Sequence, residues 1–498
     1  MGAGPGVSRK PPGKGSKVPH AAPPAPRRRR PRWLVPHAAW VFLWAVLVHA
    51  AFLAGSPDRR EPASALLYGD SIQYLLQARA LVEGTPFNEG LPFHPPLAAW
   101  LLAPLWLLSR DAGLVSLLAK GLMVLANAGA YALFYRLVRD RVPHAFWICL
   151  LLPLNFGELV LSSAVTSEAI YRLLLAVLLV LGPRLPLLSG VVHGLATLTR
   201  AEHLLLGLPL FVLGLARPRW RRAALATAAP ALLLVGLNAA WTGRTVADYN
   251  RRHAAELAEP LPAVVPVSIY GPLNFALAQG GPDIHFSRAG LPPAPGGAAQ
   301  LEPRFAPHNR YLLHGYRIGL ERIARRPGRF LARAAAKLWH SSKAVAFGWT
   351  GLDLPKHGPA SALWTRQPVD MAYGEAPVWH GVALVLIAIG AWRLRRERTF
   401  LLVGGALLAY RLAVNALFFP YLRGVAVVSP FYLTLLLAGV ALPFHRAAGK
   451  VLAGLLLVLA LIHFATAPLP RRYLASGERD ASGAVIDDRK VLIKRAPG

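Results

Sequence analysis

The sequence predicts an all-α protein that crosses a membrane many times. Of its 498 residues, 54% are hydrophobic, and the mean hydropathy is +0.40. The apolar residues gather into blocks of roughly 15–24 residues, about the length that a helix needs to cross a bilayer. These blocks lack the apolar–polar alternation of membrane β-strands, so we predict one helical bundle.

The charge distribution supports this class and argues against a nucleic-acid partner. The net charge is +31, from 55 Lys and Arg against 24 Asp and Glu. The positive residues cluster at the ends of apolar blocks, as expected for topology signals that contact anionic lipid headgroups. The sequence shows no RNP, zinc-finger or helix-turn-helix pattern. The single cysteine, Cys149, rules out an intramolecular disulfide and a cysteine metal cluster.

Residues 1–32 are predicted to be a disordered basic tail in the cytoplasm. They are rich in Gly, Pro and Ala and carry nine Lys and Arg without an acidic residue. Such a tail is similar to the start of a signal peptide. The apolar block at 33–54 is too long for one, however, and Ser56-Pro57-Asp58 is a poor cleavage site. We therefore expect an uncleaved first span.

Six further apolar blocks complete a predicted seven-helix module at 33–242, which includes a first outer loop at 55–112. Arg136, Arg139 and Arg141 close the next span, so that end is predicted to be cytoplasmic. The block at 95–108 is short, and a crossing there would place these arginines outside. We expect it to be an interfacial or re-entrant helix. The six blocks are 113–135, 143–162, 169–182, 187–199, 202–216 and 223–241.

The second half is predicted to contain a long outer segment, 243–352, and a set of C-terminal spans within 353–468. Basic residues recur at helical spacing in 329–347, which indicates an amphipathic helix lying on the membrane. A polar tail follows at 469–498. The spans are 376–392, 399–419, 425–443 and 451–467, which brings the total to about eleven.

Asp70, in the first outer loop, is the first candidate for chemistry. It precedes an apolar-periodic run, so it lies at the start of a predicted helix, with Tyr74 one turn later on the same face. A carboxylate at the membrane edge could accept a proton from a substrate that arrives from water. The alternative is a simple helix N-cap.

His94 is the second candidate, in the segment Phe93-His94-Pro95-Pro96-Leu97. The two prolines make a stiff entry into a helix and hold His94 at the outer interface. There the imidazole could hydrogen-bond a phosphate or a sugar hydroxyl. The alternative is an interfacial histidine without a ligand.

A second carboxylate, Glu168, opens the fourth span in Thr166-Ser167-Glu168, on the same predicted side as Asp70. The two carboxylates could share acid–base work or hold a divalent cation, although no ligand spacing requires a metal. The alternative is capping at the start of the helix.

Several basic residues could bind an anionic ligand. Arg200 and Glu202 most simply form an internal charge pair, but Arg200 could also contact an anionic headgroup. Arg423 lies at an outer membrane edge, where it either snorkels or forks onto a phosphate. Arg411 lies within a span and has to face the bundle interior. Lys337, in the amphipathic segment, is a further candidate cation.

Together, the order and spacing of these motifs resemble the C-type (GT-C) membrane glycosyltransferases, in particular the protein O-mannosyltransferase and lipid A aminoarabinose transferase branch. The likeness covers residues 33 to about 440. Two positions depart from the pattern: no second acid stands beside Asp70, and Ala201 replaces a proline. Five segments carry the resemblance: Asp70 with Tyr74, His94-Pro95-Pro96-Leu97, Thr166-Ser167-Glu168, Leu198-Thr199-Arg200-Ala201-Glu202, and Arg325-Arg326-Pro327-Gly328-Arg329-Phe330 leading into Lys337.

The resemblance implies an inverting transferase that takes a sugar from a polyprenyl-phosphate donor on the outer leaflet, with Asp70 as the general base. The acceptor could be a protein, a lipid or a glycan. The high Ala, Leu, Arg and Pro content is typical of a GC-rich bacterial genome, so we expect the inner membrane of a bacterium with the site on its outer side. The expected site residues are Asp70 and Glu168 for catalysis, and Tyr74, His94, Arg200, Glu202, Lys337 and Arg423 for substrate binding.

Two other classes remain open, a transporter or lipid flippase and a non-catalytic membrane scaffold. A transporter should show inverted repeats, and the sequence shows none. The chain also lacks a Gly-x-x-x-x-Gly-Lys-[Ser/Thr] loop for ATP and an Asp-x-Asp metal motif. A Gly-x-Ser-x-Gly or His-Glu-x-x-His motif of a hydrolase is likewise missing from the sequence.

Overall fold

The computed structural model describes residues 2, 34–55, 59–62, 70–280, 284, 291–294, 301–346 and 377–440. Every regular element in this part of the chain is a helix, which agrees with the predicted all-α class. Apart from Gly2, the predicted basic tail at 1–32 lies outside the described residues, as do the last span at 451–467 and the polar tail at 469–498.

In the first half of the chain, the described residues form ten α-helices, most of which overlap the apolar blocks of the sequence. The short helix α3 coincides with the block at 95–108 that was expected to lie on the outer face. The helices are α1 (Leu34–Gly55), α2 (Ser71–Glu83), α3 (Leu97–Leu108), α4 (Ala112–Val138), α5 (Ala145–Leu151), α6 (Phe156–Ser162), α7 (Ser167–Leu181), α8 (Pro186–Thr199), α9 (Leu204–Ala216) and α10 (Pro218–Arg252), with 3₁₀ turns η1 (Phe87–Gly90), η2 (Leu152–Leu154), η3 (Gly182–Arg184) and η4 (Ala201–His203).

The second half adds a helical hairpin and a C-terminal group. Helix α13 begins at a proline that suits the first helical turn, two residues before the predicted amphipathic segment. The elements are α11 (Tyr270–Gly280), α12 (Ala306–Arg325), α13 (Pro327–Ser342), η6 (Lys343–Ala346), α15 (Pro377–Arg393), α16 (Arg398–Leu417), α17 (Leu422–Ala426) and α18 (Ser429–Val440).

Four of the described helices are long and apolar enough to cross a membrane: α4, α10, α16 and most of α1. In α10 only 6% of the apolar window is buried, and the exposed side chains include Leu232, Leu233, Leu237 and Trp241. An apolar helix that is left uncovered in this way is suited to lipid contact. The structure therefore supports a membrane protein, and the number of about eleven spans stays a prediction.

Two predicted spans are interrupted helices. The block at 143–162 divides into α5 and α6 because Pro153 starts a 3₁₀ turn and Asn155 then caps α6, accepting a hydrogen bond from the Gly157 amide at 3.0 Å. The block at 425–443 overlaps the end of α17, and its described part continues as α18 from Ser429 to Val440, with Pro430 in the first turn of α18. The spacing of apolar residues and the length of each apolar block did not predict these interruptions.

The first outer loop is fastened to the end of α10. Asn88 and Glu89, within η1, both have left-handed backbone conformations, with φ of 51° and 57°. The Glu89 carboxylate lies 3.0 Å from Nε2 of His253, and the Glu89 carbonyl accepts a hydrogen bond from Arg252 at 2.6 Å. Both contacts are made by Glu89 and fasten η1 in a backbone conformation that residues other than glycine rarely adopt.

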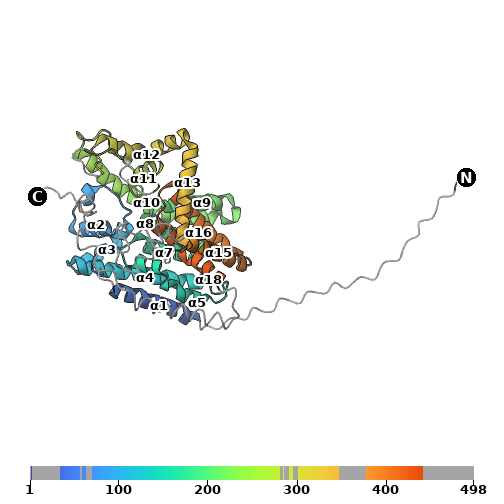
Figure 1. Ribbon diagram of the computed structural model, residues 1–498. Helices are drawn as coiled ribbons and strands as arrows, with labels where there is room; N and C mark the ends of the chain where they lie inside the picture. The colour runs from blue at the N-terminus through green and yellow to red at the C-terminus, as the bar shows by residue number, and fades with distance from the viewer. Residues whose placement is uncertain are drawn as a thin grey trace.

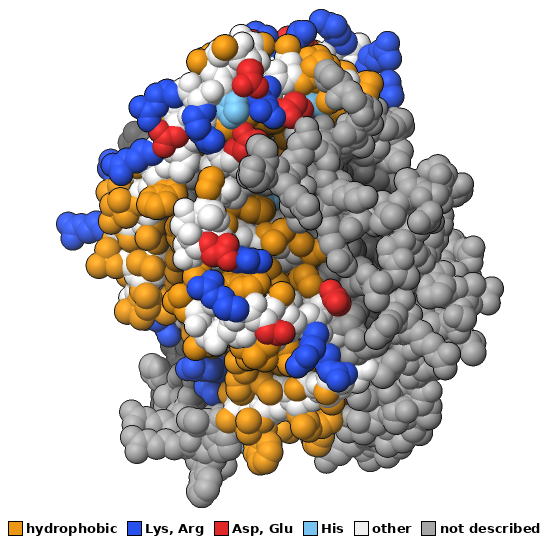
Figure 2. All heavy atoms as spheres, turned by 90° about the vertical axis from the view of Figure 1, so that its left-hand side faces the viewer, with side chains coloured by type: hydrophobic (Ala, Val, Ile, Leu, Met, Phe, Trp, Pro, Cys, Tyr) orange, Lys and Arg blue, Asp and Glu red, His pale blue; other side chains and the backbone are white. Residues whose placement is uncertain are grey.

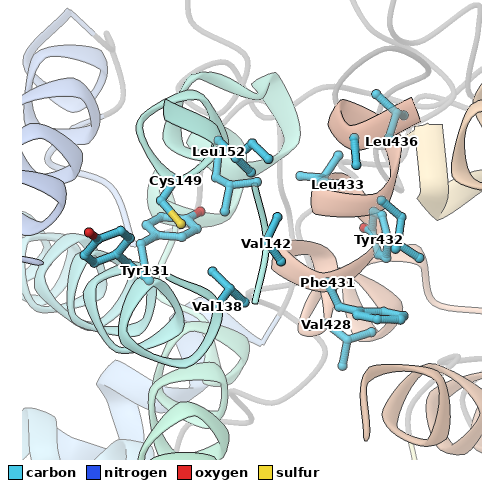
Figure 3. Close-up of a cluster of buried hydrophobic side chains, with 14 of the residues drawn as sticks. Tyr131, Val138, Val142, Cys149, Leu152, Val428, Phe431, Tyr432, Leu433 and Leu436 are labelled. Atoms are coloured by element: carbon cyan, nitrogen blue, oxygen red, sulfur yellow. The ribbon is translucent and has the colours of Figure 1, made fainter. Parts of the chain in front are cut away.

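The bundle has helices on several sides of a large apolar core. Figure 1 shows α1, α4 and α5 along its lower side, and α11 and α12 along the top. One apolar cluster includes Tyr131 of α4 and Leu152 of η2 together with Tyr432 and Leu433 of α18 (Figure 3). Segments almost 300 residues apart in sequence are thus joined by apolar burial.

Helices α15 and α18 cross at unusually close range. A Cβ added to Gly390 would lie 1.8 Å from the carbonyl oxygen of Leu435, and one added to Gly439 would lie 2.1 Å from that of Leu386. Each helix therefore presents a glycine to the backbone of the other, as is common where membrane helices pack closely.

The side of the bundle near α2 and α3 carries both apolar and charged groups. Figure 2 shows this face, on which hydrophobic side chains cover much of the left and lower areas and charged side chains gather toward the top. Exposed hydrophobic residues of α3 include Trp100, Leu101, Leu107 and Leu108. An apolar surface beside a charged one is what a protein at a membrane–water boundary presents.

Candidate functional site

Six charged side chains form a continuous chain in which acids and bases alternate. The closest contacts lie between 2.5 and 3.5 Å from one residue to the next. The members come from the starts of α2 and α7, from η4, and from α16 and α17. In order they are Asp70, Arg423, Glu168, Arg200, Glu202 and Arg411, and we call them the ion chain.

Asp70 is the most exposed end of the ion chain. It occupies the N-cap position of α2, but its side chain makes no capping hydrogen bond. Instead, Oδ2 lies 3.4 Å from Nη2 of Arg423, and 39% of the Asp70 side chain is exposed. The simple capping alternative therefore fails, and the carboxylate is held by an arginine while solvent still reaches it.

Arg423 lies between two carboxylates. Its Nη2 faces Asp70, and its Nε lies 3.5 Å from Oε1 of Glu168. Among the described residues, no side chain or carbonyl accepts a hydrogen bond from Nη1 of Arg423. A guanidinium with one free edge, 16% exposed, could bind an anionic ligand without leaving its place.

Glu168 is the buried centre of the ion chain, with 2% of its side chain exposed. Oε1 accepts a hydrogen bond from Nη1 of Arg200 at 2.6 Å. Thr166, the N-cap residue of α7, makes no side-chain capping hydrogen bond. Glu168 thus contacts two arginines, Arg200 and Arg423, and its share in acid–base work with Asp70 stays a prediction.

The predicted internal pair of Arg200 and Glu202 is present, with Nε 2.5 Å from Oε1. Arg411 completes this end, with Nη1 3.0 Å from the same Glu202 oxygen. As required for a charge in the middle of an apolar helix, Arg411 faces the interior and is buried. A Cβ at Gly424 would lie 2.5 Å from Nη2 of Arg411, so a larger residue beside Arg423 would displace this guanidinium.

His94 and Tyr74 lie beside the Asp70 end. Their ring centroids are 5.7 Å apart in an edge-to-face arrangement, and Tyr270 approaches His94 from α11 at 5.9 Å. Burial lowers the pKa of His94, with Asp70 opposing and Arg423 adding to this effect, so the imidazole is neutral at pH 7. Its buried Nε2 has no hydrogen-bond partner among the described residues, a feature that is costly unless a ligand supplies one.

Lys337, a predicted substrate-binding residue, donates to backbone groups and is not a member of the ion chain. Its buried ammonium group donates to the carbonyl oxygens of Ala278 at 3.0 Å and of Ala416 at 3.4 Å. Both hydrogen bonds thus go to the backbone of α11 and α16, and neither goes to the ion chain. Burial lowers the pKa of Lys337 to about 7, and the Arg333 charge adds to this effect.

Sequence reasoning missed a second buried network, one turn further along α7. Arg172 and Glu158 form an ion pair in which both side chains are almost fully buried. Glu158 also accepts hydrogen bonds from Tyr131 and Ser429, both without solvent contact. The signal was present in the sequence, because both charges interrupt apolar blocks and had to find partners inside the bundle.

The described residues contain no group of three or more His, Cys, Asp or Glu that could hold a metal ion. Both Asp70 and Glu168 are held by arginines instead. The prediction that these two carboxylates could bind a divalent cation therefore gains no support from the geometry.

Comparison with known proteins leaves the resemblance untested. No protein-family model matches the chain, and no curated protein or solved structure matches it.

Proposed function

We propose that the protein is an inverting glycosyltransferase that moves a sugar from a polyprenyl-phosphate donor to an acceptor at the outer face of a bacterial inner membrane. The single observation that carries this proposal is the Asp70–Arg423 pair, a solvent-reachable carboxylate and a guanidinium with a free edge at the end of a buried ion chain. The exposed apolar side chains of α3 and α10 offer a surface that the polyprenyl chain of the donor could contact within the bilayer.

Asp70 would act as the general base. Its carboxylate takes the proton of the acceptor hydroxyl as that oxygen attacks the anomeric carbon of the donor. The bond from the anomeric carbon to the phosphate oxygen breaks at the same time, and polyprenyl phosphate leaves with the bonding electrons. Attack opposite to the leaving group inverts the anomeric carbon. The step needs no nucleotide, because the phosphate ester of the donor is already activated.

Arg423 would stabilise the leaving phosphate. Negative charge grows on the phosphate as the bond breaks, and a positioned guanidinium favours that state. The free Nη1 edge can take up a phosphate oxygen while Nε stays near Glu168. His94, neutral and with an unpartnered Nε2, is suited to a sugar hydroxyl or to the same phosphate.

The rest of the ion chain would keep Arg423 in place. Each guanidinium in it contacts at least one carboxylate, and the chain ends on Arg411, which is buried in α16. A preorganised cation costs no rearrangement when the transition state forms, which is the property that electrostatic catalysis needs.

The test compares wild type with Asp70→Asn, both purified in detergent and supplied with polyprenyl-phosphate sugars and candidate acceptors. We expect transfer to fall by about 10²–10⁴-fold, the usual contribution of a general base, with donor binding retained. Asp248→Asn is the matched control, because Asp248 is exposed and pairs only with Arg251 on its own helix. Unchanged transfer in Asp70→Asn would remove the base role, and the absence of transfer by the wild type with every donor would favour the transporter or flippase alternative.

A further inference from the structure

Two links join α7 to α17, one helical turn apart. The first is the contact of Glu168 with Arg423 at 3.5 Å, which belongs to the ion chain. The second lies four residues later on α7, where Nη2 of Arg172 donates to the carbonyl oxygen of Ala426 at 2.6 Å. Positions 168 and 172 share a face of α7, so this face holds α17 at two points.

The guanidinium of Arg172 is itself fixed from three other helices. It pairs with Glu158 of α6, and it donates to Asn127 of α4 at 3.1 Å and to Ser429 of α18 at 3.1 Å. Only 3% of the Arg172 side chain is exposed. Moving Arg172 would break several of these bonds together, so its guanidinium is a fixed point to which the Ala426 carbonyl of α17 is bound.

Helix α17 needs such a fixed point. It has only five residues, and a helix of that length has little stability of its own in the absence of tertiary contacts. It nevertheless carries Arg423, whose free edge has to face the donor phosphate. The position of that guanidinium therefore depends on what holds the backbone of α17.

A purely stabilising role explains the pair less well. A buried ion pair is often no more stabilising than well-packed apolar residues of the same volume, because desolvating two charges is costly. What apolar residues cannot replace is the donated bond to a backbone carbonyl of α17. Lysine would keep the charge beside Glu158, but its single nitrogen could not serve Glu158, Asn127, Ser429 and Ala426 at once.

We propose that Arg172 is a positioning residue that fixes α17 against α7 and so sets the place of Arg423. This inference rests on the proposed function of the Asp70–Arg423 pair. Arg172 touches no substrate; it acts through the Ala426 carbonyl, three residues beyond Arg423.

The test is a double-mutant cycle read by the binding of polyprenyl phosphate to the purified full-length protein. The variants are Arg172→Lys, Arg423→Gln and the double variant. We expect Arg172→Lys to weaken binding about tenfold, the effect of misplacing one charge-assisted bond. In the Arg423→Gln background, Arg172→Lys should cause no further loss, because it acts through Arg423.

The transfer assay adds a second readout. Arg172→Lys should raise KM for the donor more than it lowers kcat for the step that uses Asp70. Thr434→Val is the matched control, because Thr434 is a buried polar residue of α18 whose hydroxyl donates to the Pro430 carbonyl of the same helix. It should leave both the binding and the KM unchanged.

The outcomes separate the two proposals. The positioning role alone would be overturned if the wild type binds polyprenyl phosphate and Arg172→Lys binds it equally well. It would also be overturned if the losses of affinity in the two single variants add fully in the double variant. An absence of polyprenyl phosphate binding by the wild type would overturn the proposed function and this inference together. Should Arg172→Lys fail to fold, Ser429→Ala removes one anchor of Arg172, and a loss of about threefold is expected; full binding in that variant would count against the proposal.

Discussion

Replacing Arg200 by methionine tests whether the ion chain stabilises the bundle as a unit. Arg200 lies between two carboxylates, with contacts of 2.6 Å to Glu168 and 2.5 Å to Glu202. Removing one partner from a buried ion pair costs about 3–5 kcal/mol, because the remaining charge stays buried. We expect the cost of Arg200→Met to lie at the lower end of this range, because other residues still contact Glu168 and Glu202.

Each carboxylate keeps one cation after the change. Glu168 retains Arg423 at 3.5 Å, and Glu202 retains Arg411 at 3.0 Å and is also partly exposed to solvent. We therefore expect the free energy of unfolding to fall by about 3 kcal/mol, which corresponds to roughly a 150-fold change in the folding equilibrium.

Reversible denaturant unfolding in detergent measures this change. Glu168→Gln in the same background should recover part of the loss, since it removes the charge that Arg200→Met leaves underpaired. Arg317→Met is the control, because Arg317 forms an exposed pair with Glu321 on α12 and should change stability by at most about 0.5 kcal/mol. A loss below about 1 kcal/mol in Arg200→Met, without coupling to Glu168, would refute the reasoning about a shared buried chain.

Two further predictions concern stability away from the ion chain. Burial lowers the pKa of Lys337 to about 7 in the folded protein. Between pH 7 and about 10, this side chain therefore stays protonated in the unfolded chain and loses its proton in the folded one. The free energy of unfolding should therefore rise from pH 7 to about 10, and this rise should be smaller in Lys337→Met; equal slopes in the two proteins would contradict it. Gly390→Ala places a methyl group 1.8 Å from the Leu435 carbonyl, so it should separate α15 from α18 and lower the free energy of unfolding by about 1–3 kcal/mol. Gly405→Ala is the control: open space surrounds Gly405, and the same unfolding measurement should show a neutral or slightly stabilising effect.

Much of the candidate site was predictable because charges are few and costly in an apolar chain. Asp70, Glu168, Arg200, Glu202 and Arg423 were selected one at a time from their motifs. The structure brings all five into one chain of contacts. A buried charge in a membrane protein needs an opposite charge, so isolated polar residues in apolar blocks tend to find one another.

Other features could not be predicted, because they depend on backbone groups or on distant segments. Lys337 contacts the carbonyls of Ala278 and Ala416, and no side-chain pattern indicates which carbonyls a folded chain leaves available. The block at 143–162 is interrupted at Pro153. Transmembrane helices sometimes tolerate proline, so the sequence alone did not indicate a break there. The pairing of Glu158 with Arg172, by contrast, was predictable, because both charges interrupt apolar blocks and each needs a partner inside the bundle.

The six members of the ion chain carry three positive and three negative charges, so the unloaded site is electrically balanced. On the proposed function, a phosphate that binds the free Nη1 edge of Arg423 brings surplus negative charge beside Asp70, which contacts Nη2 of the same guanidinium, and the two anions repel each other. Arrival of the donor would then loosen the hold on Asp70 before any acceptor hydroxyl needs it. Such repulsion would impose an order on the reaction, with the lipid-linked sugar entering first and the acceptor second.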